Sequence, residues 1–383
     1  MKRMLLGVAV ATFAMRAEAA PREFTGETRA VYAVAACGEA PPPSYDKRVV
    51  AAHCAELARA VAQWKKNWFA KASPWLGKLL EKGYPKTVVY PFGGGDVVTM
   101  LSVYPDATEY TSLSLEGIGD PRPMAKLERA KLDGGLAKLR KMLAANLNWA
   151  WNTTVQLSID SSESGAGIPG ILTIALVALD AHGYEPIEAR YFELGADGAL
   201  KYLSDEMVDA WDKQPKPTVK RKQTHAVQQG LFNNIEIVFR KKGDATAPKK
   251  TFRHIAADLS DAGLAANGGA IAYLNKRSEL AAMTKAASYL LWKPEFDKLR
   301  TLLLAKMKVM VSDDTGIPPR YAKPAGFTQT MYGTYTGAFF KWARGEVEKE
   351  MIDAWKTPAE TSLPFRFGYY DNRRTPHLMI TRK

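Results

Sequence analysis

The chain has 383 residues, 46% of them hydrophobic, and its 53 lysines and arginines exceed its 40 aspartates and glutamates, giving a net charge of +13. This length and composition are sufficient to bury the core of one large domain or of two closely packed ones. The charge favours association with anionic polymers, but no nucleic-acid-binding motif accompanies it. No segment reaches the roughly 18 consecutive apolar residues of a membrane span.

Residues 1–19 have the pattern of a secretory signal peptide. Lys2 and Arg3 precede an apolar segment, and Ala17-Glu18-Ala19 fits the small-x-small cleavage pattern. No cysteine stands at the cleavage point, so a lipid anchor is not indicated. We therefore expect a mature chain that begins near Ala20, is periplasmic or secreted, and has no transmembrane span.

The two cysteines, Cys37 and Cys54, both belong to this mature chain. In an oxidising compartment they favour one disulfide, which would stabilise the fold by about 3 kcal/mol. The alternative is a pair of buried free thiols. A catalytic cysteine is least favoured, because His53, next to Cys54, would project from another helix face.

An N-terminal helical segment is expected over residues 20–85. Apolar residues from Val50 to Trp68 recur at helical spacing and predict a helix over 46–72. Ser73-Pro74 fits an N-cap followed by proline, so a second helix should begin there and end at Gly83. Tryptophans alternate with lysines over 64–86, which fits a membrane-surface helix or, more ordinarily, a buried tryptophan stripe with a solvated lysine face.

Residues 86–119 predict a strand, a glycine turn, a helix and a second strand. Val88 to Tyr90 lead into Gly93-Gly94-Gly95-Asp96, and the second apolar run ends at Glu116. This is the pattern of a βαβ unit. Because parallel sheets gather ligands at the carboxyl ends of their strands, the turn and Glu116 mark a candidate site.

Helices and strands alternate through the rest of the α/β domain, 86–383. The expected elements are a helix over 126–151 broken at Gly134-Gly135, a strand over 153–159, a helix over 169–182, a strand over 187–194, a basic loop near 212–225, antiparallel strands over 235–239 and 252–258, a helix over 269–276, a strand over 283–291, a helix over 295–306, a strand over 309–311, a helix over 339–355, and strands over 365–370 and 377–380. The fold class predicted from this alternation is α/β, with a mixed, mainly Rossmann-like sheet and flanking helices.

The turn at Gly93 to Asp96 resembles the glycine-acidic turn of class I methyltransferases over about 30 residues. That resemblance implies that Glu116, which closes the second strand, would hold the ribose hydroxyls of the cofactor. The turn lacks the third glycine of G-x-G-x-x-G, Asp96 would repel a phosphate, and an exported protein has no supply of S-adenosylmethionine. The alternative is an ordinary strand-to-helix turn in which Asp96 caps the helix.

A G-x-G-x-x-G match does occur at Gly165, Gly167 and Gly170, with Glu193 further on. Pro169 at the first helical position explains it as a helix start. Ser44-x-x-Lys47 matches a nucleophile motif by chance, in a proline-rich loop. The five histidines show no metal-ligand spacing, so a histidine zinc site is not expected.

Asp313-Asp314 follows an apolar run and is the other candidate site. Adjacent aspartates bind a hard cation or share a proton, and they are also ordinary turn residues. If three of the predicted strands run parallel, the carboxylates of Asp96, Glu116, Asp258 or Asp261, and Asp313 or Asp314 meet at one edge of the sheet, with Tyr90, Arg320 and Tyr321 nearby. Such a cluster suits a divalent cation, a cationic or polyhydroxylated ligand, or acid–base chemistry on a glycosidic bond.

Four motifs resemble an uncharacterised family of exported bacterial proteins. They are Y-P-F-x-G-x-D at Tyr90–Asp96, a strand start at Tyr104–Ala107, K-A-A-S-Y-L at 285–290, and D-D-x-G-I-P-x-R-Y at Asp313–Tyr321. Gly95 departs from the family, where proline is expected. The resemblance implies no activity, but it supports treating the glycine turn and the aspartate turn as one site.

The sequence therefore predicts an exported soluble protein of unknown activity with a carboxylate-lined ligand pocket. The candidate ligand-binding residues are Gly93, Gly94, Gly95, Asp96, Glu116, Arg320 and Tyr321, and the candidate catalytic residues are Asp96, Glu116, Asp313 and Asp314. A divalent cation is the cofactor considered, and a small molecule, a glycan or an anionic envelope polymer is the partner considered. The alternatives are a hydrolase of envelope glycans with paired carboxylates and a non-catalytic protein that binds envelope polymers through its basic, tryptophan-bearing surface.

Overall fold

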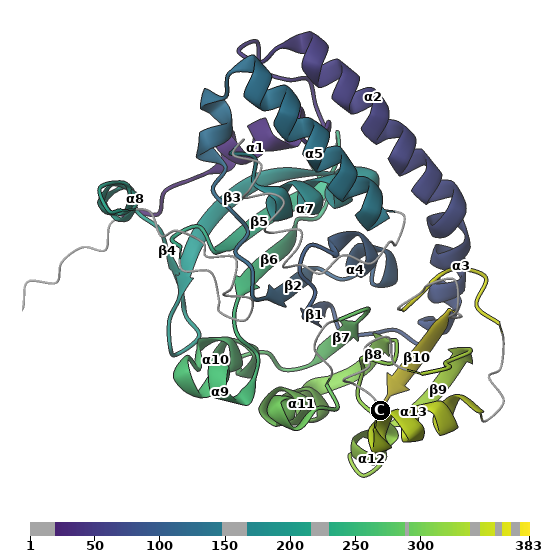
Figure 1. Ribbon diagram of the computed structural model, residues 1–383. Coiled ribbons are helices and arrows are strands. Elements are labelled where there is room, and N and C mark those ends of the chain that lie inside the picture. The colour runs from purple at the N-terminus through teal and green to yellow at the C-terminus, as the bar shows by residue number, and fades with distance from the viewer. Residues whose placement is uncertain are drawn as a thin grey trace, which may run out of the picture.

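The computed structural model describes residues 20–147, 167–215, 230–287, 291–337, 345–356, 362–368 and 376–383. Its centre is a ten-stranded mixed sheet with the order β4-β3-β5-β6-β2-β1-β7-β8-β10-β9 (Figure 1). The strands are β1 (Thr87–Pro91), β2 (Glu109–Ser114), β3 (Tyr184–Leu194), β4 (Leu200–Tyr202), β5 (Asn234–Lys241), β6 (Lys250–Ala256), β7 (Leu280–Thr284), β8 (Met307–Ser312), β9 (Thr328–Gly333) and β10 (His377–Arg382). The predicted α/β class is confirmed.

Five neighbouring strands, β6, β2, β1, β7 and β8, are parallel to one another. Both outer parts of the sheet are antiparallel: β4, β3 and β5 on the β6 side, and β10 and β9 on the β8 side. The βαβ unit predicted over 86–119 is confirmed, because β1 and β2 are parallel and α4 connects them. The predicted antiparallel pairing of 235–239 with 252–258 is confirmed as well.

Helices cover both faces of the sheet. They are α1 (Thr25–Val34), α2 (Lys47–Trp64), η1 (Lys65–Phe69), α3 (Ala70–Leu79), α4 (Val97–Val103), η2 (Arg122–Lys126), α5 (Arg129–Leu147), α7 (Gly170–Ala181), α8 (Asp205–Asp212), α9 (Asp261–Ala266), α10 (Gly269–Asn275), η3 (Pro294–Phe296), α11 (Asp297–Lys306), α12 (Pro319–Ala322) and α13 (Glu346–Lys356). In Figure 1, α1, α2, α4, α5 and α7 lie on one face and α9, α10 and α11 on the other. Each set packs on the sheet through its own hydrophobic cluster.

None of the helices in the described part of the chain has both the length and the apolar composition that crossing a bilayer requires. The most apolar of them, α7, is buried between the sheet and its neighbouring helices. Its start behind Pro169 agrees with the helix start expected there. The predicted disulfide is confirmed, since Cys37 and Cys54 are bonded with their Cα atoms 5.5 Å apart.

Two predicted helix interruptions are wrong. The helical path continues from α2 through the π-helical turn η1 into α3, and Pro74 lies inside α3 rather than at its start. Burial of Trp68, Ala72 and Leu76 on one side holds this path together despite the backbone hydrogen bond that proline cannot donate. Likewise α5 runs through Gly134-Gly135, because its leucines are buried on both sides of the glycine pair.

The predicted strand over 365–370 is also wrong for residues 365–368, which form no strand. Phe365 and Phe367 are 4% and 0% exposed, and the backbone carbonyl of Arg366 accepts a hydrogen bond from Trp68 Nε1 at 2.7 Å. Their apolar alternation therefore reflects packing against the helices. The tenth strand in the sheet order, β9, was not predicted. The elements expected over 153–159 and 369–370, most of the basic loop near 212–225, the start of the helix over 339–355, and residues 1–19 lie outside the described residues.

Candidate functional site

Five ionisable side chains from four strand ends form what we call the strand-end cluster: Asp96, Lys285, Asp313, Asp314 and His377. Asp96 follows β1, Lys285 follows β7, and the two aspartates follow β8. These strands are parallel neighbours, so their carboxyl ends meet at one edge of the sheet. His377 is the first residue of β10, which is antiparallel to β8 and therefore begins where β8 ends.

Asp96, which is half-buried, and Lys285, which is buried, form an ion pair with 2.7 Å between Oδ2 and Nζ. Asp96 also accepts hydrogen bonds from the hydroxyls of Thr99, at 2.6 Å, and Tyr90, at 3.1 Å. Lys285 Nζ contacts the Thr99 hydroxyl at 3.1 Å. Burial lowers the pKa of the Lys285 ammonium, and the charge of Asp96 opposes that shift. Asp96 thus stands at the N-terminus of α4 but pairs with side chains instead of capping the backbone.

Asp313 is 0% exposed and is held by three donors. Its Oδ2 accepts the Ala286 N–H at 2.6 Å, and its Oδ1 accepts the Thr315 N–H at 2.9 Å together with the Thr315 hydroxyl. Ala286 has a φ of 50°, a left-handed conformation that alanine rarely adopts, and in this conformation its N–H reaches the carboxylate. Burial, and then the charge of Asp314, raise the pKa of Asp313 to about 6.

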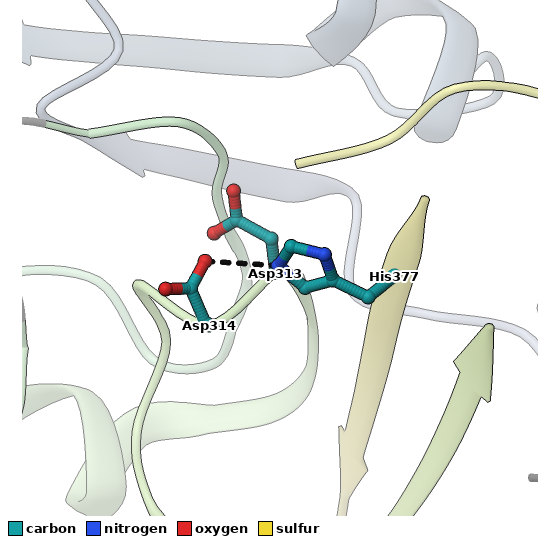
Figure 2. Close-up of side chains that lie close together, drawn as sticks. All are labelled: Asp313, Asp314 and His377. Atoms are coloured by element: carbon teal, nitrogen blue, oxygen red, sulfur yellow. Dashed lines mark hydrogen bonds and ion pairs between the residues drawn. The ribbon is translucent and has the colours of Figure 1, made fainter. Parts of the chain in front are cut away.

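Asp314 and His377 form the second pair of the cluster, with Oδ1 and Nε2 2.9 Å apart (Figure 2). The Tyr335 hydroxyl donates a hydrogen bond to Asp314, and burial raises the pKa of that hydroxyl. The rings of Tyr335 and Trp355 lie 5.0 and 5.7 Å from the His377 ring, centroid to centroid. These contacts fix the orientation of the imidazole.

Asp313, Asp314 and His377 offer a metal-ligand set. One ligand atom from each lies within 4.8 Å of the other two, and all three residues are buried. Figure 2 shows the two carboxylates, on the segment that follows β8, facing the imidazole of His377 at the start of β10. Carboxylate oxygens and an imidazole nitrogen are donors that suit Zn²⁺, Mn²⁺ or Fe²⁺.

The glycine turn is filled by protein atoms. A Cβ atom at Gly93 would lie 2.6 Å from the Tyr90 ring, and one at Gly95 would lie 3.2 Å from Ile174 of α7. Gly94 has a φ of 48°. The glycines therefore allow close packing of the turn against β1 and α7. Asp96 at the end of this turn is paired with Lys285.

Glu116 contacts the β6 side of the sheet. It is 3% exposed, and its backbone carbonyl accepts a hydrogen bond from His254 Nε2 at 2.7 Å. Burial lowers the pKa of His254 to about 4, so this imidazole is neutral at physiological pH. This hydrogen bond ties the segment after β2 to β6, whereas Asp96 and Asp313 follow β1 and β8, which lie on the other side of β2 in the sheet.

The other predicted site residues have local partners. Arg320 is exposed and pairs with Glu350 of α13, and the Arg300 guanidinium lies 4.0 Å from the Tyr321 ring centroid. Asp258 accepts the Ser260 N–H at 2.9 Å, and Asp261 accepts the Lys298 N–H at 2.9 Å. The predicted convergence therefore holds for Asp96, Asp313, Asp314 and Tyr90. Sequence reasoning missed Lys285, although it lies in the K-A-A-S-Y-L motif, and His377.

Comparison of the chain with models of protein families, with curated proteins and with solved structures gives no match. The chemistry of the strand-end cluster is therefore the basis for a functional inference. Its distinguishing properties are burial, convergence from four strand ends, and a donor set of two carboxylates and one imidazole.

Proposed function

We propose that this is an exported α/β protein that binds a divalent cation through Asp313, Asp314 and His377. The observation that carries the proposal is the charge of the strand-end cluster. Its three carboxylates face one ammonium and one imidazole, so the negative charge stays in excess even when the imidazole is protonated. In the described part of the chain, these carboxylates form ion pairs with Lys285 and His377 alone.

Buried charge in excess is costly unless a counter-ion or a proton compensates it. Without a cation, a proton does so in part, because the pKa of Asp313 rises to about 6. Above that pH the cluster carries its full negative charge, and a divalent cation neutralises it. Bound there, a cation would polarise a coordinated water molecule or a substrate oxygen.

The surrounding hydrogen bonds have the form expected around metal ligands. The N–H groups of Ala286 and Thr315 orient Asp313, and the Tyr335 hydroxyl orients Asp314. Such outer partners fix ligand geometry and sustain affinity. The chain thereby pre-organises all three ligands.

The position of the cluster in the sheet supports a ligand site. Numbered among themselves, the five parallel strands have the order 3-2-1-4-5, which is the order of Rossmann-like sheets. In such sheets ligands bind where the strand order reverses, which in this sheet is between β1 and β7. Asp96 and Lys285 come from the ends of these two strands.

Export is the second part of the proposal. The signal-peptide pattern of residues 1–19 supports it, and so does the disulfide between Cys37 and Cys54, since disulfides persist in oxidising compartments. Finding the mature protein in a periplasmic or culture fraction, with an N-terminus near Ala20, tests this part.

A hydrolase of envelope glycans is the second candidate. It is favoured by the pKa of Asp313, because a carboxylic acid that titrates near 6 beside a second carboxylate can act as general acid. Asp313 and Asp314 are 0% and 3% exposed, however, and a cation reaches such groups more readily than a polysaccharide does. Release of reducing ends from envelope glycans, lost in Asp313→Asn, is the test.

The cation is tested by thermal unfolding of chelator-treated protein with Zn²⁺, Mn²⁺, Mg²⁺ and Ca²⁺. A cation at about 100 times its Kd should raise the free energy of unfolding by about 2.7 kcal/mol. Asp314→Asn and His377→Asn should lose this increase, and the matched control Asp209→Asn, an exposed carboxylate on α8, should keep it. Equal responses of all four proteins, or no response to any cation, would contradict the proposal.

A further inference from the structure

A groove of about 460 Å³ lies between α3 and the two outer strands β9 and β10. Thr328, Thr330 and Tyr332 line it from alternate positions of β9, and Ile380 and Arg382 line it from β10. Thr330 pairs with Ile380 and Thr328 with Arg382, and Tyr332 is two residues beyond Thr330, so all five share one face of the sheet. The groove lies toward the carboxyl end of β10, whereas His377 of the strand-end cluster is at its amino end.

Two aromatic side chains, Trp75 and Tyr332, line the groove and are packed in place. Trp75 packs edge-to-face against Tyr332 and Phe365, with ring centroids 5.0 and 5.3 Å apart. Its indole is partly buried and contributes to the groove surface. A rigid indole offers an apolar surface to the C–H face of a sugar ring at little cost in conformational entropy.

Most of the charged side chains that line the groove are cationic. Lys78, Lys82 and Arg382 line it together with a single acid, Glu81. Both lysines are exposed, and in the described part of the chain neither forms an ion pair. Arg382 is held in place, because its guanidinium donates hydrogen bonds to the backbone carbonyls of Gly83 and Leu79.

We propose that this groove binds a segment of an acidic polysaccharide, with sugar carboxylates at Lys78 and Lys82 and a sugar ring on Trp75. The net charge of +13 would attract such a polymer. A neutral glycan has no charged groups that could pair with Lys78 and Lys82. A phosphate polymer has no sugar ring to pack on Trp75 and no ring hydroxyls to bond to Thr328 and Thr330. A lipid bilayer presents a flat surface, which does not enter a concave groove. This proposal is independent of the cation site.

The test is titration of the full-length mature protein with polygalacturonate at fixed ionic strength, with dextran and polyphosphate as comparison polymers. The groove variant is Lys78→Glu with Lys82→Glu. Its matched control is Lys66→Glu with Lys71→Glu, two exposed lysines on the same helical path that do not line the groove. Both double variants change the net charge by the same amount. A difference between them therefore reports binding at the groove and not the long-range attraction of the net charge.

We expect the groove variant to bind polygalacturonate roughly tenfold or more weakly and the control variant to lose no more than about twofold. Thr330→Val, which removes a hydroxyl and keeps the shape of the side chain, should weaken polygalacturonate binding alone. Unfolding curves verify that each variant is folded. Equal losses in both double variants, no binding of polygalacturonate, or tighter binding of polyphosphate that Thr330→Val leaves unchanged would overturn the proposal.

Discussion

Two charge networks of this molecule differ in charge balance: acids and arginines are matched in one, and carboxylates are in excess in the other. The first, which we call the cross-strand network, consists of Glu236 on β5 between Arg190 on β3 and Arg253 on β6. Glu236 Oε1 accepts from Arg190 and from the Tyr202 hydroxyl, at 3.1 and 2.9 Å, and Oε2 accepts from Arg253 at 2.8 Å. The charges are matched because Arg190 also pairs with Glu23 and Glu188, and Arg253 with Glu109. The second is the strand-end cluster, in which carboxylates are in excess.

The difference follows from how each network is assembled. Arg190, Glu236 and Arg253 are direct neighbours in the strand register, so sheet pairing alone brings opposite charges together. The strand-end cluster is assembled from the ends of four strands, and its pairing leaves carboxylate charge uncompensated by the described residues. A matched network is sufficiently explained by stability, whereas an unmatched one requires a ligand or a proton.

Neutralising the acid of the matched network should have the largest effect. Glu236→Gln would remove the buried carboxylate that Arg190 and Arg253 share, although each keeps a more exposed acid partner. We expect the free energy of unfolding to fall by about 3 kcal/mol. Denaturant unfolding measures this. Glu279→Gln, which breaks an exposed pair with Lys308, is the control and should cost less than about 1 kcal/mol. If Glu236→Gln and Glu279→Gln lower the free energy of unfolding by the same amount, the charge of Glu236 does not stabilise the cross-strand network.

Neutralising Asp313 in the unmatched network should have an effect on stability that depends on pH. Folding raises the pKa of Asp313 from 3.8 to about 6, so the folded protein binds the extra proton between these values. The contribution of Asp313 to stability is therefore greatest below pH 4 and is lost as the pH rises through 6. Without a cation, wild-type stability minus that of Asp313→Asn should fall by about 2 to 3 kcal/mol from pH 4 to pH 7.

Using the difference between the two proteins removes other titrations from this measurement. Burial lowers the pKa of His182 and of His254 to about 4, which makes the protein less stable as the pH falls through the same window. Both histidines are present in wild type and variant, so their effect cancels. A flat difference between pH 4 and pH 7 would show that Asp313 does not carry the excess charge.

The smallest effect is expected at Arg320, which the sequence assigned to the ligand pocket. Its pair with Glu350 is exposed, so Arg320→Ala should change the free energy of unfolding by less than about 0.5 kcal/mol. The increase in melting temperature on adding the cation should stay as in wild type. If Arg320→Ala loses that increase, the cation site includes Arg320, and the site is then larger than the strand-end cluster.

Much of the site was predictable because local sequence signals coincide with strand ends. An apolar run followed by Gly93–Asp96, and another followed by Asp313-Asp314, place carboxylates after buried strands whatever the order of the sheet. His377 gave no such signal, because its partner Asp314 is 63 residues away and the contact depends on β10 pairing with β8. Lys285 was noted only as part of the K-A-A-S-Y-L motif, and the pairing of β7 with β1 is what places it against Asp96.

The sequence by itself determined the alternation of helices and strands, the βαβ unit and the cysteine pair, since periodicity and turn residues act over short stretches of chain. It did not determine that α2, η1 and α3 form one helical path or that the glycine turn is closed by α7. Only the tertiary structure decided which charges meet, because the strand order sets the neighbours of each strand end. Burial then turned ordinary aspartates into a cluster whose carboxylate charge the described residues do not balance.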